Sequence, residues 1–141
     1  MSQPTVNKLF VYGTLMSTVS VPLGRSMRSR LRRESSLLGP ARTHGRLYDL
    51  GSYPGLVVSN NPSDHVHGEV FELHEPSITL PWLDAYEGIG SIKAPDDLYI
   101  REARTVWLER RTAEAWVYIF NGSIEQAQHV SGGRWPPEQV S

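Results

Sequence analysis

The chain has 141 residues, of which 39% are hydrophobic and 21% are charged, and its formal net charge at pH 7 is −1. This length fits one folded domain with a substantial core, and the near-neutral charge excludes a global electrostatic reason to expect nucleic acid as a partner. The sequence has no cysteine, which excludes disulfides, thiolate metal sites and cysteine nucleophiles.

The N-terminal residues do not show the basic and then apolar pattern of a signal peptide, and no apolar run is long enough to span a bilayer. We therefore expect a cytoplasmic protein with no membrane partner. One domain is expected over residues 1–141, with a core at about 8–120 and an irregular tail at 121–141, which Trp135 would fasten to the body.

An apolar, partly β-branched run at 9–11 predicts the first buried strand, at about 8–12. Gly13 ends it and Thr14 offers a hydroxyl, so the chain turns just after Tyr12. A glycine-containing turn at the end of a strand exposes backbone N–H groups that can hold a carboxylate or an oxyanion. An ordinary strand and turn would give the same pattern.

A helix is predicted at about 25–34, with Met27 and Leu31 on its inner face. The five arginines in this segment could form a patch for an anionic partner or simply a solvated helix face. Beyond a turn at 39–40, one strand is expected at 41–50 and a short one at 56–58.

The strand predicted at 65–73 places His65, His67 and Glu69 on one face. These side chains could form a metal triad, but they would spread over about 13 Å at a rise of roughly 3.3 Å per residue. Phe71 and Leu73 continue the same face, which favours a strand packed on the core. We therefore expect no metal site.

A helix is predicted at 76–88, with Ser77 as N-cap, Pro81 in or near the first turn and Gly88 at its end. Glu87 shares a face with two leucines, Leu80 and Leu83, while Ile78, Trp82 and Tyr86 form an adjacent apolar stripe. Burial there would raise the pKa of Glu87, as a general base at neutral pH requires. A solvated residue at the helix end is the alternative, and Asp84, one turn earlier, is expected to be exposed.

Further strands are expected at 98–101, 104–108 and 113–120, with a polar hairpin tip at 109–112. About six short strands joined mostly by hairpins, with one or two small helices, indicate an α+β fold. The sheet is expected to be mixed or antiparallel and could close as a small β-barrel.

Six short motifs occur in a characteristic order. They are VYGTL at 11–15, GRLYDL at 45–50 with YPG at 53–55, GEVF at 68–71, LDAYEG at 83–88, YIR at 99–101 and AWVY at 115–118. In this order the sequence resembles the gamma-glutamylcyclotransferase-like family, and within it the branch of AIG2-like proteins and gamma-glutamylamine cyclotransferase. The resemblance covers about residues 8–120.

The resemblance implies a small mixed β-barrel flanked by short helices, and a transferase or lyase that releases 5-oxoproline from a small-molecule gamma-glutamyl substrate without a cofactor. The glutamyl part would be bound by four turn residues, Tyr12, Gly13, Thr14 and Leu15, and Glu87 would be the acid/base residue. Tyr118 could supply a hydroxyl or a wall to the pocket. Arg101 could meet a carboxylate, more simply in a structural ion pair.

Two other functions are considered. A non-catalytic binding or regulatory module could keep the same fold and pocket without turnover. An anion-binding protein could use the arginine-rich segment at 25–33, and its binding would depend strongly on salt. The sequence does not identify the leaving group or the oligomeric state.

Overall fold

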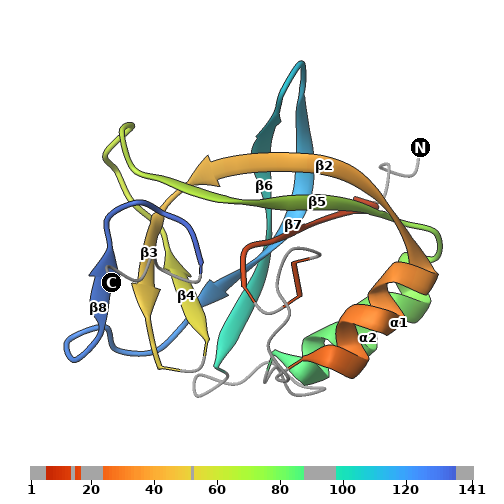
Figure 1. Ribbon diagram of the computed structural model, residues 1–141, viewed down its shortest axis with the longest axis horizontal. Helices are drawn as coiled ribbons and strands as arrows, with labels where there is room; N and C mark the ends of the chain where they lie inside the picture. The colour runs from red at the N-terminus through yellow and green to blue at the C-terminus, as the bar shows by residue number, and fades with distance from the viewer. Residues whose placement is uncertain (1–5, 14, 17–23, 52, 88–97, 136–141) are drawn as a thin grey trace, which may run out of the picture.

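The computed structural model describes residues 6–13, 15–16, 24–51, 53–87 and 98–135 (Figure 1). In these ranges the chain forms eight strands and two helices. In chain order they are β1 (Lys8–Val11), α1 (Arg25–Glu34), β2 (Ser35–His44), β3 (Arg46–Asp49), β4 (Pro54–Val57), β5 (His65–Leu73), α2 (Pro76–Tyr86), β6 (Tyr99–Leu108), β7 (Thr112–Phe120) and β8 (Gln128–Val130).

Five of the strands close into a small barrel. Neighbouring strands follow the order β1, β5, β2, β6 and β7, and β7 pairs back with β1 through Leu9 and Trp116. Within the barrel the pairs are antiparallel except for β1 with β7. Beyond β7 the sheet continues with β4, which is parallel to β7, and then with β3 and β8. The α+β fold with a mixed β-barrel and short flanking helices is therefore confirmed.

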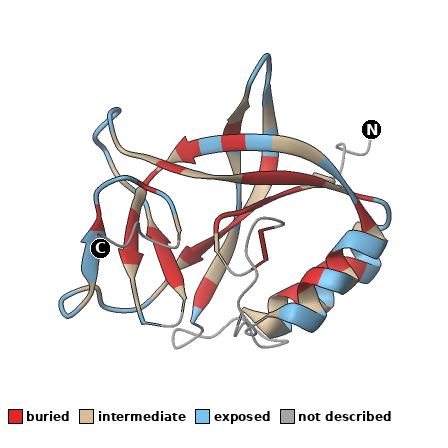
Figure 2. Ribbon diagram, viewed as in Figure 1, coloured by how far each residue is buried: buried red, intermediate tan, exposed pale blue. Residues whose placement is uncertain are grey.

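The helices α1 and α2 lie side by side at one side of the barrel (Figure 1). Leu31 of α1 and Leu83 of α2 are fully buried, as the spacing of apolar residues predicts. Burial is concentrated in the barrel strands and on the inner sides of the helices (Figure 2). The buried residues form two groups, and β1 contributes alternately to both. Leu9 and Val11 pack with the helices, whereas Phe10 and Tyr12 belong to the group around Val66, Val70 and Val117.

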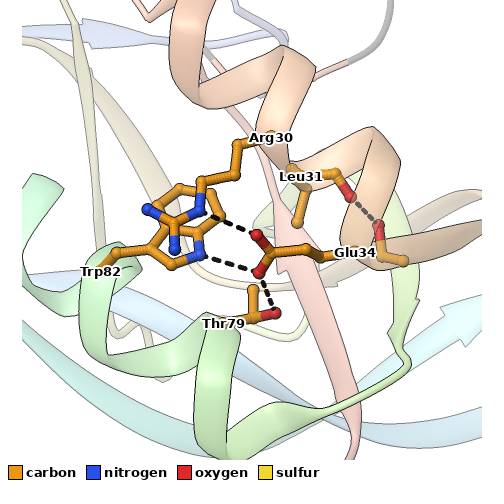
Figure 3. A network of polar contacts seen from close by, with 6 residues as sticks. Arg30, Leu31, Glu34, Thr79 and Trp82 are labelled. Carbon is orange, nitrogen blue, oxygen red and sulfur yellow. Dashed lines mark hydrogen bonds and ion pairs between the residues drawn. The ribbon is translucent and has the colours of Figure 1, made fainter.

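Glu34, at the C-terminal end of α1, joins the two helices (Figure 3). One carboxylate oxygen accepts hydrogen bonds from the Thr79 hydroxyl at 2.7 Å and from Trp82 Nε1 at 3.0 Å, both on α2. The other accepts from Arg30 Nε at 2.8 Å, and the guanidinium lies 4.7 Å from the centre of the Trp82 ring. These contacts lower the pKa of Glu34 to about 2, the bonds from Thr79 and Trp82 having the largest effect.

Two predicted boundaries in the first half of the sheet are wrong. The expected strand at 41–50 is two strands, because the chain bends at Gly45, which has a φ of 155° and lies against Leu56. The expected turn at 39–40 lies within β2, where the pairing with β5 shifts register between Leu37 and Gly39. A bulge therefore takes the place of the turn.

The start of α2 also differs from the prediction. Glu75 is the N-cap and Pro76 the first helical residue, so Ser77 lies inside the helix. Pro81 lies inside α2, beyond its first turn, and both Pro81 and Ser77, whose backbone carbonyl loses its helical donor, are exposed. Ile78 is 51% exposed and does not join Trp82 and Tyr86 against the core.

The C-terminal half contains more regular structure than predicted. Residues 99–108 form one continuous strand, and the tail, expected to be irregular, contributes β8, which pairs with β3. Trp135 packs against both groups of buried residues, as expected of a residue that fastens the tail. No helix within the described ranges has the length and apolar character required to cross a membrane.

Candidate active site

A cavity of about 210 Å³ opens where β1 ends, beside the C-terminal end of α2. Its walls come from β1 and the turn after it, the start of β4, the end of α2, the start of β6, and β7. The lining residues are Phe10, Val11, Tyr12, Gly13, Leu15, Tyr53, Pro54, Tyr86, Glu87, Leu98, Tyr99 and Tyr118.

Glu87 follows the last residue of α2, and its backbone N–H still donates to Leu83 O at 2.9 Å. Its side chain lies on the cavity and makes no hydrogen bond to any other described residue. Burial, and to a smaller extent the nearby carboxylate of Asp84, together raise the pKa of Glu87 to about 8. Glu87 is thus a partly buried carboxyl group that can gain or lose a proton near neutral pH.

Three tyrosines with perturbed hydroxyls line the same cavity as Glu87. Burial is the main cause that raises the pKa of Tyr12, Tyr99 and Tyr118 above the ordinary value, and the charge of Glu87 contributes to each shift. Tyr12 donates to Tyr118 O at 2.6 Å and accepts from Leu56 N at 3.1 Å. Tyr99 donates to Pro54 O at 2.6 Å. These hydroxyls remain neutral at physiological pH and fix the cavity wall.

Asp84 is partly buried rather than exposed, because partners from two strands reach it. It accepts from Arg101 Nε at 2.8 Å and Nη2 at 3.3 Å, and from the Tyr118 hydroxyl at 2.7 Å. The guanidinium of Arg101 lies 4.3 Å from the centre of the Trp116 ring. Arg101 therefore forms the structural ion pair that was expected of it.

The turn after β1 is closed by a hydrogen bond from Met16 N to Gly13 O at 3.1 Å. A Cβ atom on Gly13 would lie 2.9 Å from both Cγ and Cδ of Pro54. Glycine is thus required here by close packing against the start of β4. The structure brings Tyr12, Gly13 and Leu15 to the same cavity as Glu87, whereas Thr14 lies outside the described residues.

Seven aromatic or apolar wall residues were not predicted as site residues: Phe10, Val11, Tyr53, Pro54, Tyr86, Leu98 and Tyr99. All except Phe10 and Leu98 belong to motifs that carry the family resemblance, which is the signal that could have found them. Leu98 stands in no motif, and its position at the cavity depends on where β6 begins.

The two other features considered in the sequence lie apart from the cavity lining. His65 stacks on His44 with ring centres 4.9 Å apart, and within the described ranges no three His, Asp or Glu side chains are placed to hold a metal ion. In the arginine-rich segment Arg28 is buried and Arg30 pairs with Glu34, whereas Arg25 and Arg33 are exposed.

Residues 9–137 match the family described as gamma-glutamyl cyclotransferase, AIG2-like. A Vibrio cholerae protein provisionally named a gamma-glutamylcyclotransferase is 34% identical over 90% of this chain and 93% of its own. The gamma-glutamylcyclotransferase family protein YtfP of Escherichia coli K12 is 28% identical over 91% of this chain and 95% of its own.

Solved structures are similar in fold. The solution structure of YtfP from Escherichia coli has a TM-score of 0.61 and 25% identity, covering 92% of this chain and 96% of that one. The crystal structure of an AIG2-like protein from Mus musculus has a TM-score of 0.64 and 24% identity, covering 85% of this chain and 80% of that one. By sequence and by fold, the chain belongs to the AIG2-like gamma-glutamyl cyclotransferase family.

Proposed function

We propose that this protein is a gamma-glutamyl cyclotransferase that converts a small gamma-glutamyl amide into 5-oxoproline and a free amine. The observation that carries the proposal is the position of Glu87, a carboxyl group with a pKa of about 8, on the same cavity as the turn at Gly13. The volume of about 210 Å³ is below the range of roughly 300–1,000 Å³ typical of drug-sized ligands. It suits a ligand as small as a glutamyl group.

In the proposed reaction the α-amine of the substrate attacks its own γ-carbonyl carbon. Glu87 first takes a proton from the α-ammonium group, whose ordinary pKa is about 8. A carboxylate of similar basicity accepts this proton without a large free-energy penalty, which an ordinary glutamate could not do. The new C–N bond closes a five-membered ring and places a negative charge on the former carbonyl oxygen.

Collapse of this tetrahedral intermediate completes the reaction. Glu87 returns the proton to the leaving nitrogen, and the original amide C–N bond breaks. The ring nitrogen, which still carries two protons after the attack, loses one of them to the departing amine, so 5-oxoproline and an ammonium product are released. One carboxyl group thus acts as base and then as acid, a contribution on the order of 10²–10⁴-fold. Holding the amine against the carbonyl contributes further, because well-oriented intramolecular attack corresponds to effective molarities of about 10⁵ M or more.

In this proposal the turn residues Tyr12, Gly13, Thr14 and Leu15 hold the glutamyl group and the oxyanion, and Tyr118 contacts the substrate from the neighbouring strand β7. The supporting observations are the shared cavity for the described members of this set and the packing of Gly13 on Pro54, which fixes the turn. Backbone N–H groups are suited to an oxyanion because they carry no charge that would require desolvation.

The test is the release of 5-oxoproline from a panel of gamma-glutamyl amines and amino acids. Glu87→Gln keeps the shape of the side chain but cannot carry the proton, so we expect the rate to fall by about 10²–10⁴-fold. Glu75→Gln, an exposed glutamate at the other end of α2, is the matched control. Equal and negligible release by the wild type and Glu87→Gln would refute the enzymatic proposal. Thermal stabilisation by glutamyl ligands without product would instead indicate a binding module.

A further inference from the structure

The direction of the Tyr118 hydroxyl is fixed by the chemistry of its partner. The hydroxyl has one proton, and its partner at 2.7 Å is the carboxylate of Asp84, which can only accept. The proton therefore points to Asp84, and the lone pairs of the Tyr118 oxygen remain as acceptors. A hydroxyl fixed in this way can bind a cationic N–H donor but cannot donate to a carbonyl oxygen.

Arg101 holds the Asp84 carboxylate in place. It approaches with two nitrogens, and its guanidinium lies over Trp116, so it is fixed by a ring as well as by the ion pair. Asp84 comes from α2, Arg101 from β6 and Tyr118 from β7. The three side chains thus link the helix that precedes Glu87 to two neighbouring strands of the barrel.

The titratable groups near Glu87 are of two kinds, neutral tyrosine hydroxyls and one charged carboxylate. Tyr12, directly after β1, Tyr99 of β6 and Tyr118 of β7 line the cavity together with Glu87, and their raised pKa values keep them neutral. Asp84, one turn earlier on the same helix, is the described charged group that shifts the pKa of Glu87, and it does so upward. The Asp84 carboxylate therefore acts on both polar groups of this part of the cavity, Tyr118 and Glu87.

We propose, building on the cyclotransferase function above, that Asp84 is a positioning residue for the reaction: held by Arg101, it fixes the Tyr118 hydroxyl as an acceptor for the α-ammonium group of the substrate. The ammonium group then lies between Tyr118 and Glu87, the residue that receives its proton. This arrangement orders the donor before the transfer, and Asp84 itself need not touch the substrate.

The decisive variant is Asp84→Asn, which keeps the side-chain shape and removes the charge. Two quantities are measured: steady-state kinetics with a gamma-glutamyl amide, and titration of Glu87 by NMR on protein labelled with ¹³C at the glutamate carboxyls. The Glu87 signal is assigned by its absence in Glu87→Gln. We expect KM to rise about tenfold and the titration midpoint of Glu87 to fall by about 1 pH unit.

Tyr118→Phe and Glu102→Gln separate the two effects. Tyr118→Phe removes the acceptor but leaves Asp84, so KM should rise about tenfold while the Glu87 midpoint stays near its wild-type value. The double variant Asp84→Asn/Tyr118→Phe should show no further rise in KM, because both changes remove the same contact. Glu102→Gln is the control: it disrupts an exposed pair with Arg104 on the same strand as Arg101 and should change neither quantity.

Arg101→Gln provides an independent test should Asp84→Asn fail to fold. Removing the cation strengthens the effect of the Asp84 charge, so the Glu87 midpoint should rise, opposite in sign to Asp84→Asn. A residue with only a structural role would lower the thermal stability of both variants and leave the midpoint unchanged. That result, or additive KM effects in the double variant, would overturn the inference.

Binding of γ-glutamylmethylamide, measured by calorimetry, separates this inference from the proposed function. If the wild type binds the compound without releasing 5-oxoproline, the cyclotransferase proposal fails, whereas loss of binding in Asp84→Asn and Tyr118→Phe still supports the positioning role. Equal affinity of all three proteins would overturn the positioning role. Absence of binding to the wild type would count against both.

Discussion

The Glu34 carboxylate that joins α1 to α2 offers a sharp test of how the helix bearing the site is held. We consider Glu34→Gln, which preserves the shape of the side chain. The amide oxygen can still accept from Thr79 and Trp82, but the amide nitrogen would then face Arg30 Nε, and two donors would meet. The substitution therefore removes one charge-assisted hydrogen bond and weakens two others.

Two estimates of the magnitude agree. Loss of one hydrogen bond to a charged group destabilises by about 1.5–3 kcal/mol. The depression of the Glu34 pKa from 4.5 to about 2 would correspond to about 3.5 kcal/mol at most, at about 1.4 kcal/mol per pH unit. The side chains of Glu34 and Arg30 are 24% and 39% exposed, so solvent screening reduces this upper bound. We expect Glu34→Gln to lower the free energy of unfolding by about 1–2 kcal/mol at pH 7.

The reasoning can be tested by measuring how the stability difference between the wild type and Glu34→Gln changes with pH. Because the pKa of Glu34 is lower in the folded protein, the stabilisation is complete above about pH 4.5 and disappears as the pH falls towards 2. Urea unfolding of the wild type and Glu34→Gln at pH 7 and pH 3 should therefore show a difference that shrinks markedly at pH 3. The exposed Glu102→Gln should differ from wild type by less than about 0.5 kcal/mol at both. A Glu34→Gln difference equal at pH 7 and pH 3 would refute the reasoning.

Three further predictions concern the cavity and the tail. Because the pKa of Glu87 is raised from 4.5 to about 8, its contribution to stability is lost as the pH rises from about 4.5 to 8. In thermal melts Glu87→Gln should therefore exceed the wild type in Tm at pH 9 and match it at pH 4, and equal values at pH 9 would contradict this. Gly13→Ala places a Cβ atom 2.9 Å from Pro54 and should lower the free energy of urea unfolding by about 1–3 kcal/mol, with slower 5-oxoproline release; unchanged stability would exclude the contact. Gly133→Ala combines a φ of 67° with a Cβ atom that would collide with the backbone oxygen of His65, so a loss of at least about 2 kcal/mol in urea unfolding is expected, and a wild-type midpoint would contradict it.

The parts of the structure that were predicted correctly depend on local patterns. Alternation of apolar residues located β5 and β7, and the spacing of Met27 and Leu31 located α1. The split of residues 41–50 was missed because Gly45 fits the alternation as well as it fits a bend. The strand in the tail was missed because it depends on pairing with β3, about 80 residues away in the sequence, which leaves no local signal.

In the candidate site, too, the features with a local sequence pattern were predicted and those that depend on distant parts of the chain were not. The motifs indicated Glu87 and the turn at Gly13, and the structure places both on one cavity. The partners of Asp84 could not be predicted, because Arg101 and Tyr118 reach it from strands 17 and 34 residues further along the chain. A carboxylate near a helix end looks solvated until the strands packed beside it are known.

The closure of the barrel has a consequence for ligand binding. The seam between β1 and β7 consists of a single residue pair, Leu9 with Trp116, fewer than at any other junction of the five-stranded barrel. β1 leads directly into Tyr12 and Gly13, and Tyr118 lies two residues beyond Trp116. A ligand that contacts both Tyr12 or Gly13 and Tyr118 would therefore stabilise the junction between β1 and β7, which has the fewest paired residues in the barrel. Amide hydrogen exchange at Leu9 and Trp116 should slow when the cavity is filled, which makes the seam a reporter of occupancy.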